Sequence, residues 1–146
     1  MRADPIRIKT YLTQIRRSSL DLNQIIHENE LVPDSIPLKA TKYILIELAE
    51  AMSGTIQHIL AKEMGIPVSG YLDTVVKGYE NGILSKDLFQ RLKPFFDFRN
   101  SLVHLYWQID DRRLIENLKI GYRDFDDFIE EIEAFLEQSG REKIIL

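Results

Sequence analysis

The chain contains no cysteine, which excludes disulfide bonds and thiolate metal ligands and agrees with a reducing compartment. It also lacks an apolar run long enough to cross a bilayer. The first residues are polar and charged at once, without the apolar segment of a secretory signal. We therefore expect a cytoplasmic protein that does not interact with a membrane.

A basic surplus is missing as well. Nineteen lysines and arginines stand against 23 acidic residues, for a net charge of −4. Extended binding along nucleic-acid phosphates normally needs a basic face, so any contact with RNA should be local. No His-Glu-x-x-His or similar ligand spacing is present, and we expect neither a metal nor a cofactor.

Period-two strand patterns are absent, and helical spacing is found almost everywhere. With 146 residues and 45% apolar composition, we expect one domain over residues 1–146 with a proper core. Its architecture is predicted as all-α, an up-and-down helical bundle with short inserted helices. The expected helices span residues 5–30, a long segment after the break at 32–37 up to 64, 72–79, 85–92, a segment after Pro94, a turn or two from 110, and 125 to about 139.

Small residues give the second long helix a thin flank, where a neighbouring helix can approach closely: Ala49, Ala51, Ser53 and Gly54. The acidic run of the last helix is interpreted as its solvent face: Asp124, Asp126, Asp127, Glu130 and Glu131. Arg16-Arg17 and Arg112-Arg113 are small basic spots, of which the second could help with phosphate. His27 and His58 are interpreted as structural or exposed.

Residues 99–106 concentrate chemistry as no other segment does, because they combine Arg99, Asn100, His104 and Tyr106 within two helical turns. A helix places Asn100 and His104 on one face at i, i+4. Judged by spacing alone, such a group is more often a hydrogen-bonding cluster at a surface or interface than a catalytic centre.

Helical phasing divides this segment into two faces. An apolar core stripe is predicted to contain Phe95, Phe98, Leu102, Leu105 and Ile109. Val103 and Trp107 share much of the opposite side with Asn100 and His104, and something must cover them. A second copy packed two-fold is the simplest cover, so we expect a homodimer with the polar group at its seam.

The stretch from Phe98 to Asp110, with Arg99, four residues, His104, one residue and Tyr106, resembles the signature of HepT-type HEPN proteins, the toxins of MntA–HepT toxin–antitoxin modules. Residues 46–59, 71–82 and 124–135 also resemble the family's helices and their connection. The resemblance implies a HEPN-type helical bundle and a metal-independent endoribonuclease of a type VII-like module. Its active site would lie in the cleft of a homodimer.

Residue roles follow from the resemblance. Arg99 would hold phosphate oxygens, His104 would be the acid or base, and Asn100 would orient one of them. Tyr106 would receive AMP from a small nucleotidyltransferase antitoxin, MntA-like, and this modification would neutralise the toxin. A non-catalytic HEPN module that docks a nucleotidyltransferase or nucleotide remains the alternative, as does a structural helical dimer without a ligand.

Overall fold

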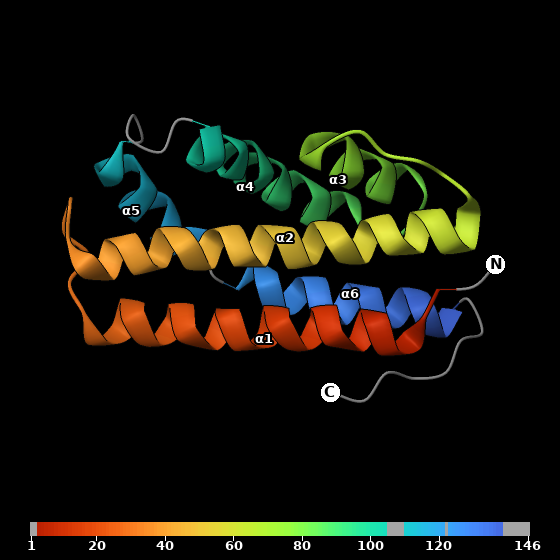
Figure 1. The fold of residues 1–146 in the computed structure, drawn as a ribbon, viewed down its shortest axis with the longest axis horizontal. Coiled ribbons are helices and arrows are strands. Elements are labelled where there is room, and N and C mark those ends of the chain that lie inside the picture. The colour runs from red at the N-terminus through yellow and green to blue at the C-terminus, as the bar shows by residue number, and fades with distance from the viewer. Residues whose placement is uncertain (1–2, 105–109, 122, 139–146) are drawn as a thin grey trace.

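The computed structural model describes residues 3–104, 110–121 and 123–138, and their side chains except at 100–104, 117 and 119–121. These residues form no strand and six helices (Figure 1): α1 (Pro5–Glu28), α2 (Ile36–Met64), α3 (Tyr71–Glu80), α4 (Lys86–His104), α5 (Asp111–Gly121) and α6 (Asp124–Gln138). None of the described helices is long and apolar enough to cross a membrane.

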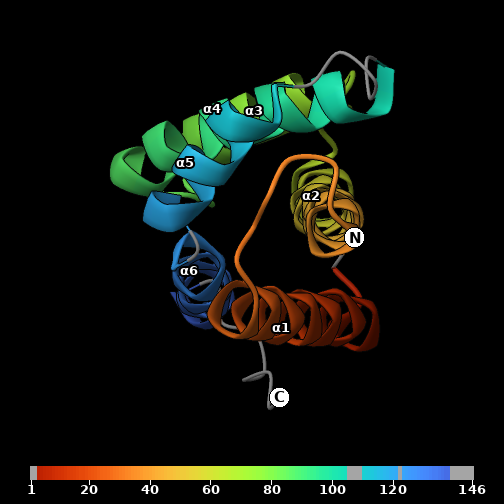
Figure 2. The same cartoon turned by 90° about the vertical axis from the view of Figure 1, so that its left-hand side faces the viewer.

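Four of the helices build the bundle. In Figure 1, α1 and α4 run in one direction and α2 and α6 in the other. Figure 2 shows the bundle end-on, with α3 and α5 on the side of α4. The predicted up-and-down bundle with short inserted helices is confirmed.

Side-chain caps begin these helices where the sequence predicts them. Asp4 Oδ1 accepts the N–H of Ile6 at 3.0 Å ahead of Pro5, and Ser85 Oγ accepts the N–H of Leu88 at 3.1 Å. Ser35 caps α2, so this helix begins within the expected break and takes Pro37 into its first turn. The positive φ of 65° at Gly65 ends α2.

The core runs along the bundle axis between α1, α2, α4 and α6. Its largest fully buried side chains include Leu12, Leu48, Met52, Phe96 and Phe128. Close packing of α1 on α2 uses the predicted thin flank, because a Cβ added at Gly54 would lie 2.7 Å from Tyr11 Cε1. A side chain at position 54 would therefore displace the tyrosine ring.

Pro94 does not break the chain into two helices, contrary to the prediction. It lies inside the continuous helix α4. Leu92 and Phe96, on either side of it, are buried in the same core, whereas Pro94 and Gln90 are exposed. Pro94 has no N–H to donate to the carbonyl of Gln90, and the core packing on either side of it outweighs this local penalty.

The core stripe of α4 is also shifted from the prediction. Phe95 and Phe98 are only half-buried, while Phe96 is fully buried, and Arg99 is buried with it. The reason is tertiary: α4 turns its 92, 96, 99 face toward α2 and α3. Leu102, Leu105 and Ile109 lie outside the described side chains.

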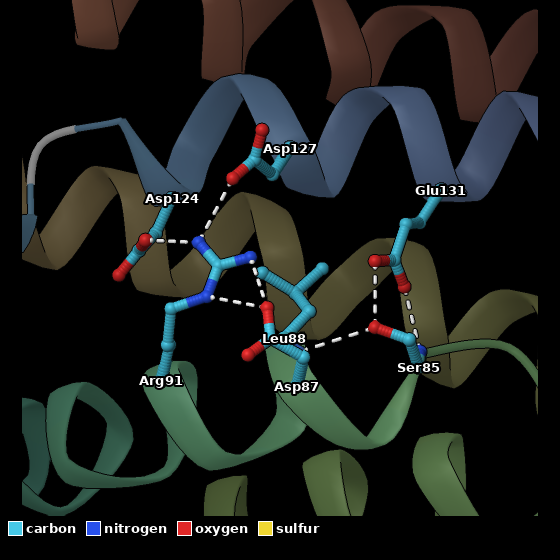
Figure 3. A network of polar contacts seen from close by, with 7 residues as sticks. All are labelled: Ser85, Asp87, Leu88, Arg91, Asp124, Asp127 and Glu131. Carbon is cyan, nitrogen blue, oxygen red and sulfur yellow. Dashed lines mark hydrogen bonds and ion pairs between the residues drawn. The ribbon is translucent and has the colours of Figure 1, made fainter.

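The acidic run of α6 is not simply a solvent face, and this prediction is corrected (Figure 3). Arg91 of α4 pairs with both Asp124 and Asp127 of α6, the latter at 2.8 Å. Glu131 accepts the N–H and hydroxyl of Ser85 at 2.6 and 2.7 Å. Three of the five carboxylates thus join α6 to the start and first turns of α4, while Asp126 and Glu130 are exposed.

Helix α5 is held to the start of α2 by a shielded ion pair. Lys42 Nζ lies 2.7 Å from Asp111 Oδ1, and Asp111 Oδ2 accepts the N–H of Asp34 at 3.0 Å. Burial alone would raise the pKa of Asp111, but these two bonds outweigh it and lower the pKa. The chain that leaves α4 is therefore returned to a defined point beside α2.

Candidate functional site

Arg99 is the one predicted site residue whose side chain the structure describes. Helix α4 continues through His104, so the backbone of Arg99, Asn100 and His104 has the predicted helical phasing. The side chains of Asn100 and His104 lie outside the described residues. Tyr106, and Val103 and Trp107 of the proposed dimer face, lie outside them too.

Arg99 is buried against two residues to which the sequence reasoning gave no role at the site. Its side chain is 8% exposed, and its Nη2 forms an ion pair with Oε1 of Glu50 from α2. Its guanidinium carbon lies 3.6 Å from the ring centroid of Tyr71 at the start of α3. A planar cation thus has a carboxylate at its edge and an aromatic ring at its face.

Tyr71 completes this three-helix cluster. Its hydroxyl donates to the same Glu50 oxygen at 2.5 Å, and its ring stacks at 6.4 Å on Phe96. Burial and the bond to Glu50 raise the pKa of Tyr71 to about 12, although the positive charge of Arg99 acts in the opposite direction. We call Glu50, Tyr71 and Arg99 the Arg99 clamp.

The clamp has limited chemistry in this arrangement. Glu50 neutralises the charge of Arg99 locally, and Nε of Arg99 is buried without a hydrogen-bond partner among the described residues. Arg99 also borders a cavity of about 420 Å³ formed with the start of α3, Phe96 and Asp97. To bind a phosphate, the guanidinium must exchange its bond to Glu50 or use its remaining N–H groups.

Two signals in the sequence could have found the clamp. Glu50 is a lone charge within the otherwise apolar run Leu48-Ala49-Glu50-Ala51-Met52. Tyr71 follows Gly70, whose φ of 88° sets the entry into α3. Neither signal indicates that Arg99 is the partner, because the three residues are brought together only by the packing of their helices.

The remaining candidates are placed as follows. His58 Nε2 accepts the N–H of Asp4 at 2.8 Å, and burial, reinforced by Arg7, lowers the pKa of His58. His27 is exposed on α1 near the carbonyl of Asn23. Both arginine pairs, 16–17 and 112–113, are exposed. Within the part of the chain that the structure describes, no three His, Asp or Glu side chains gather as a possible metal site.

The chain thus combines an all-α bundle with a buried arginine on α4, five residues ahead of His104. Solved structures agree on the fold. A tri-AMPylated HEPN toxin of Shewanella oneidensis, in complex with an MNT antitoxin, matches with a TM-score of 0.78 at 19% identity, over 88% of this chain and 97% of that chain. YutE of Bacillus subtilis, a cytosolic protein of unknown function, matches with a TM-score of 0.81 at 18% identity, over 98% of both chains.

A structure of an MntA–HpeT toxin–antitoxin mutant also matches, with a TM-score of 0.78 at 19% identity over 88% of this chain and 98% of that one. No curated protein matches the sequence. The family model described as ribonuclease HepT-like matches residues 8–132. This chain belongs to the HepT-like ribonuclease family.

Proposed function

We propose that this chain is the toxin of a type VII-like toxin–antitoxin module and acts in the cytoplasm as a metal-independent endoribonuclease. The observation that carries this proposal is the family match over residues 8–132, which includes the whole motif from Arg99 to Tyr106. We treat residues 1–146 as one HEPN domain and place its active site in the cleft of a homodimer.

The chemistry uses a nucleophile that RNA itself supplies. His104 takes the proton of the 2′-hydroxyl, the 2′-oxygen attacks the adjacent phosphorus, and the bond from phosphorus to the 5′-oxygen breaks. His104 of the partner subunit gives a proton to the leaving 5′-oxygen. Arg99 stabilises the charge on the phosphoryl oxygens and Asn100 orients the phosphate or the imidazole. The products carry a 2′,3′-cyclic phosphate and a 5′-hydroxyl.

Tyr106 is the control point of this proposal. Its phenol oxygen attacks the α-phosphorus of ATP on a small nucleotidyltransferase, pyrophosphate leaves, and the phenolic proton is lost. The attached AMP then blocks RNA sterically and competes for Arg99. In support, the similar HEPN toxin of Shewanella oneidensis is described as tri-AMPylated and in complex with an MNT antitoxin.

Purified protein tests the nuclease directly. We expect cleavage of RNA in EDTA, 2′,3′-cyclic phosphate ends, and loss of both cleavage and growth arrest in Arg99→Ala and His104→Ala. Cleavage that requires added magnesium and leaves 5′-phosphates would refute the mechanism.

Light scattering that shows a monomer at micromolar concentration would refute the shared cleft. Peptide mass spectrometry after coexpression with the antitoxin should find AMP on Tyr106.

One observation favours the second candidate, a non-catalytic HEPN module that docks a nucleotidyltransferase or a nucleotide. Arg99 is buried and already neutralised by Glu50, as expected for a structural ion pair. In that case wild type and the Arg99 and His104 variants grow equally on induction. If only the wild type arrests growth, the result supports the nuclease.

A further inference from the structure

An open pocket of about 760 Å³ lies between α1, α2 and the start of α3. Its walls include three tyrosines and two glutamates: Tyr11, Tyr43, Tyr71, Glu47 and Glu50. Its size is in the range of ligand-binding pockets. The nuclease chemistry proposed above does not use it.

The charge of this pocket selects the ligand. Among the described residues that line it there is no lysine, arginine or histidine. Within the part of the chain that the structure describes, the carboxylate of Glu47 has one polar contact, a long one of 3.5 Å from Gln14 Nε2. An anion would therefore meet two carboxylates without a counter-charge, whereas a cation would meet both, with aromatic faces beside them.

The structure already contains a bound example of this ligand chemistry. The guanidinium of Arg99 is paired with Glu50 and lies 3.6 Å from the Tyr71 ring centroid. Glu50 and Tyr71 also line the pocket. Because Glu50 is 53% exposed, its carboxylate is accessible to a second cation from the solvent side.

We propose that this pocket binds the arginine or lysine side chain of a different protein. An exposed tyrosine at the pocket, Tyr43 at 64% exposure, is the kind of residue that anchors protein interfaces. A basic partner is favoured because Glu47 and Glu50 are the only charged side chains among the described residues that line the pocket. Occupation of the pocket draws Glu50 toward the incoming cation and weakens its bond to Arg99.

Amide NMR titration of the full chain tests this binding. The probes are blocked tripeptides, acetyl-Gly-Arg-Gly-amide and its neutral counterpart with glutamine. We expect the arginine peptide to shift the backbone signals of Tyr43, Glu47 and Glu50 saturably, with a Kd on the order of 1–10 mM. The Nε–H signal of Arg99 should shift in the same titration. The glutamine peptide should leave all of these signals in place.

Two variants outside the Arg99 clamp test the pocket, and a third is the control. Glu47→Gln and Tyr43→Ala should each weaken the arginine peptide about three- to tenfold, while Glu137→Gln, an exposed charge on α6, should leave it unchanged. Equal effects of all three variants, or no saturable shift in the wild type, would overturn the proposal. Concentration-dependent shifts of the same signals without peptide would assign the pocket to a second copy, and tighter binding of spermidine would assign it to a small polyamine. Either result overturns the protein partner without bearing on RNA cleavage.

Discussion

Glu50 on α2 holds Arg99 on α4, and the two residues are 49 positions apart in sequence. Their pairing removes the charge of Arg99 from solvent and fixes the orientation of its guanidinium, with Tyr71 across its face. The arginine of the predicted motif is thus held by residues of two other helices, to which the sequence reasoning gave no role at the site.

Replacing Glu50 by glutamine should lower the free energy of unfolding by about 1 kcal/mol. The amide can still accept from Tyr71, but buried Arg99 loses its counter-charge, and the partial exposure of Glu50 moderates the loss. Urea denaturation measures the change. Glu47→Gln is the matched control, since Glu47 lies on the same helix without a contact to Arg99 among those the structure gives. Equal losses in the two variants would contradict a specific role of the pair.

Tyr71 should make stability fall in alkaline solution. Its pKa rises from 10 to about 12 in the folded chain, so the unfolded chain releases this proton first as the pH rises. The contribution is fully present below pH 10 and is lost between about 10 and 12. Following the tyrosinate absorbance with pH should reveal a component near 12 that disappears in Tyr71→Phe. An unchanged titration curve in Tyr71→Phe would show that the component near 12 does not belong to Tyr71.

Arg91 should show measurable coupling to α6. It pairs with Asp127 at 2.8 Å, with Asp87 at 3.0 Å and with the shielded carboxylate of Asp124 (Figure 3). A double-mutant cycle of Arg91→Met and Asp124→Asn should give a coupling of about 1 kcal/mol that declines with salt. The same cycle with Asp126→Asn, on an exposed neighbour, should give none. Coupling of similar size in both cycles would indicate a general charge effect.

Pro94→Ala should stabilise the protein by about 1–2 kcal/mol. Alanine restores an N–H donor to the Gln90 carbonyl and removes the steric clash of the proline ring. This gain exceeds the stability that proline provides by lowering the conformational entropy of the unfolded chain. Thermal unfolding detects the change. Pro5→Ala serves as control, because a proline at the first helical position costs no hydrogen bond. A lower melting temperature for Pro94→Ala would show that the local geometry of α4 depends on the proline.

Sequence reasoning succeeded where the determinants are local. Asp4 with Pro5, Ser85 and Gly65 mark helix ends through their own backbone and side-chain chemistry, and the three-four spacing of α1 and α2 matches their buried faces. It failed at Pro94 and at the acidic run of α6, where the outcome depends on neighbouring helices. A proline is tolerated because α4 buries residues on both sides of it, and acids on α6 are used because Arg91 lies opposite.

The sequence by itself determined the all-α bundle, most helix ends and the family motif from Arg99 to Tyr106, since propensity, capping and spacing operate within a few residues of each other. Only the tertiary structure decided which charges meet. Glu50, Tyr71 and Arg99 come from three helices, and nothing in their separate surroundings specifies that they pack together. Ion pairs and pockets depend on the angles and offsets between helices, which arise from packing of the whole core.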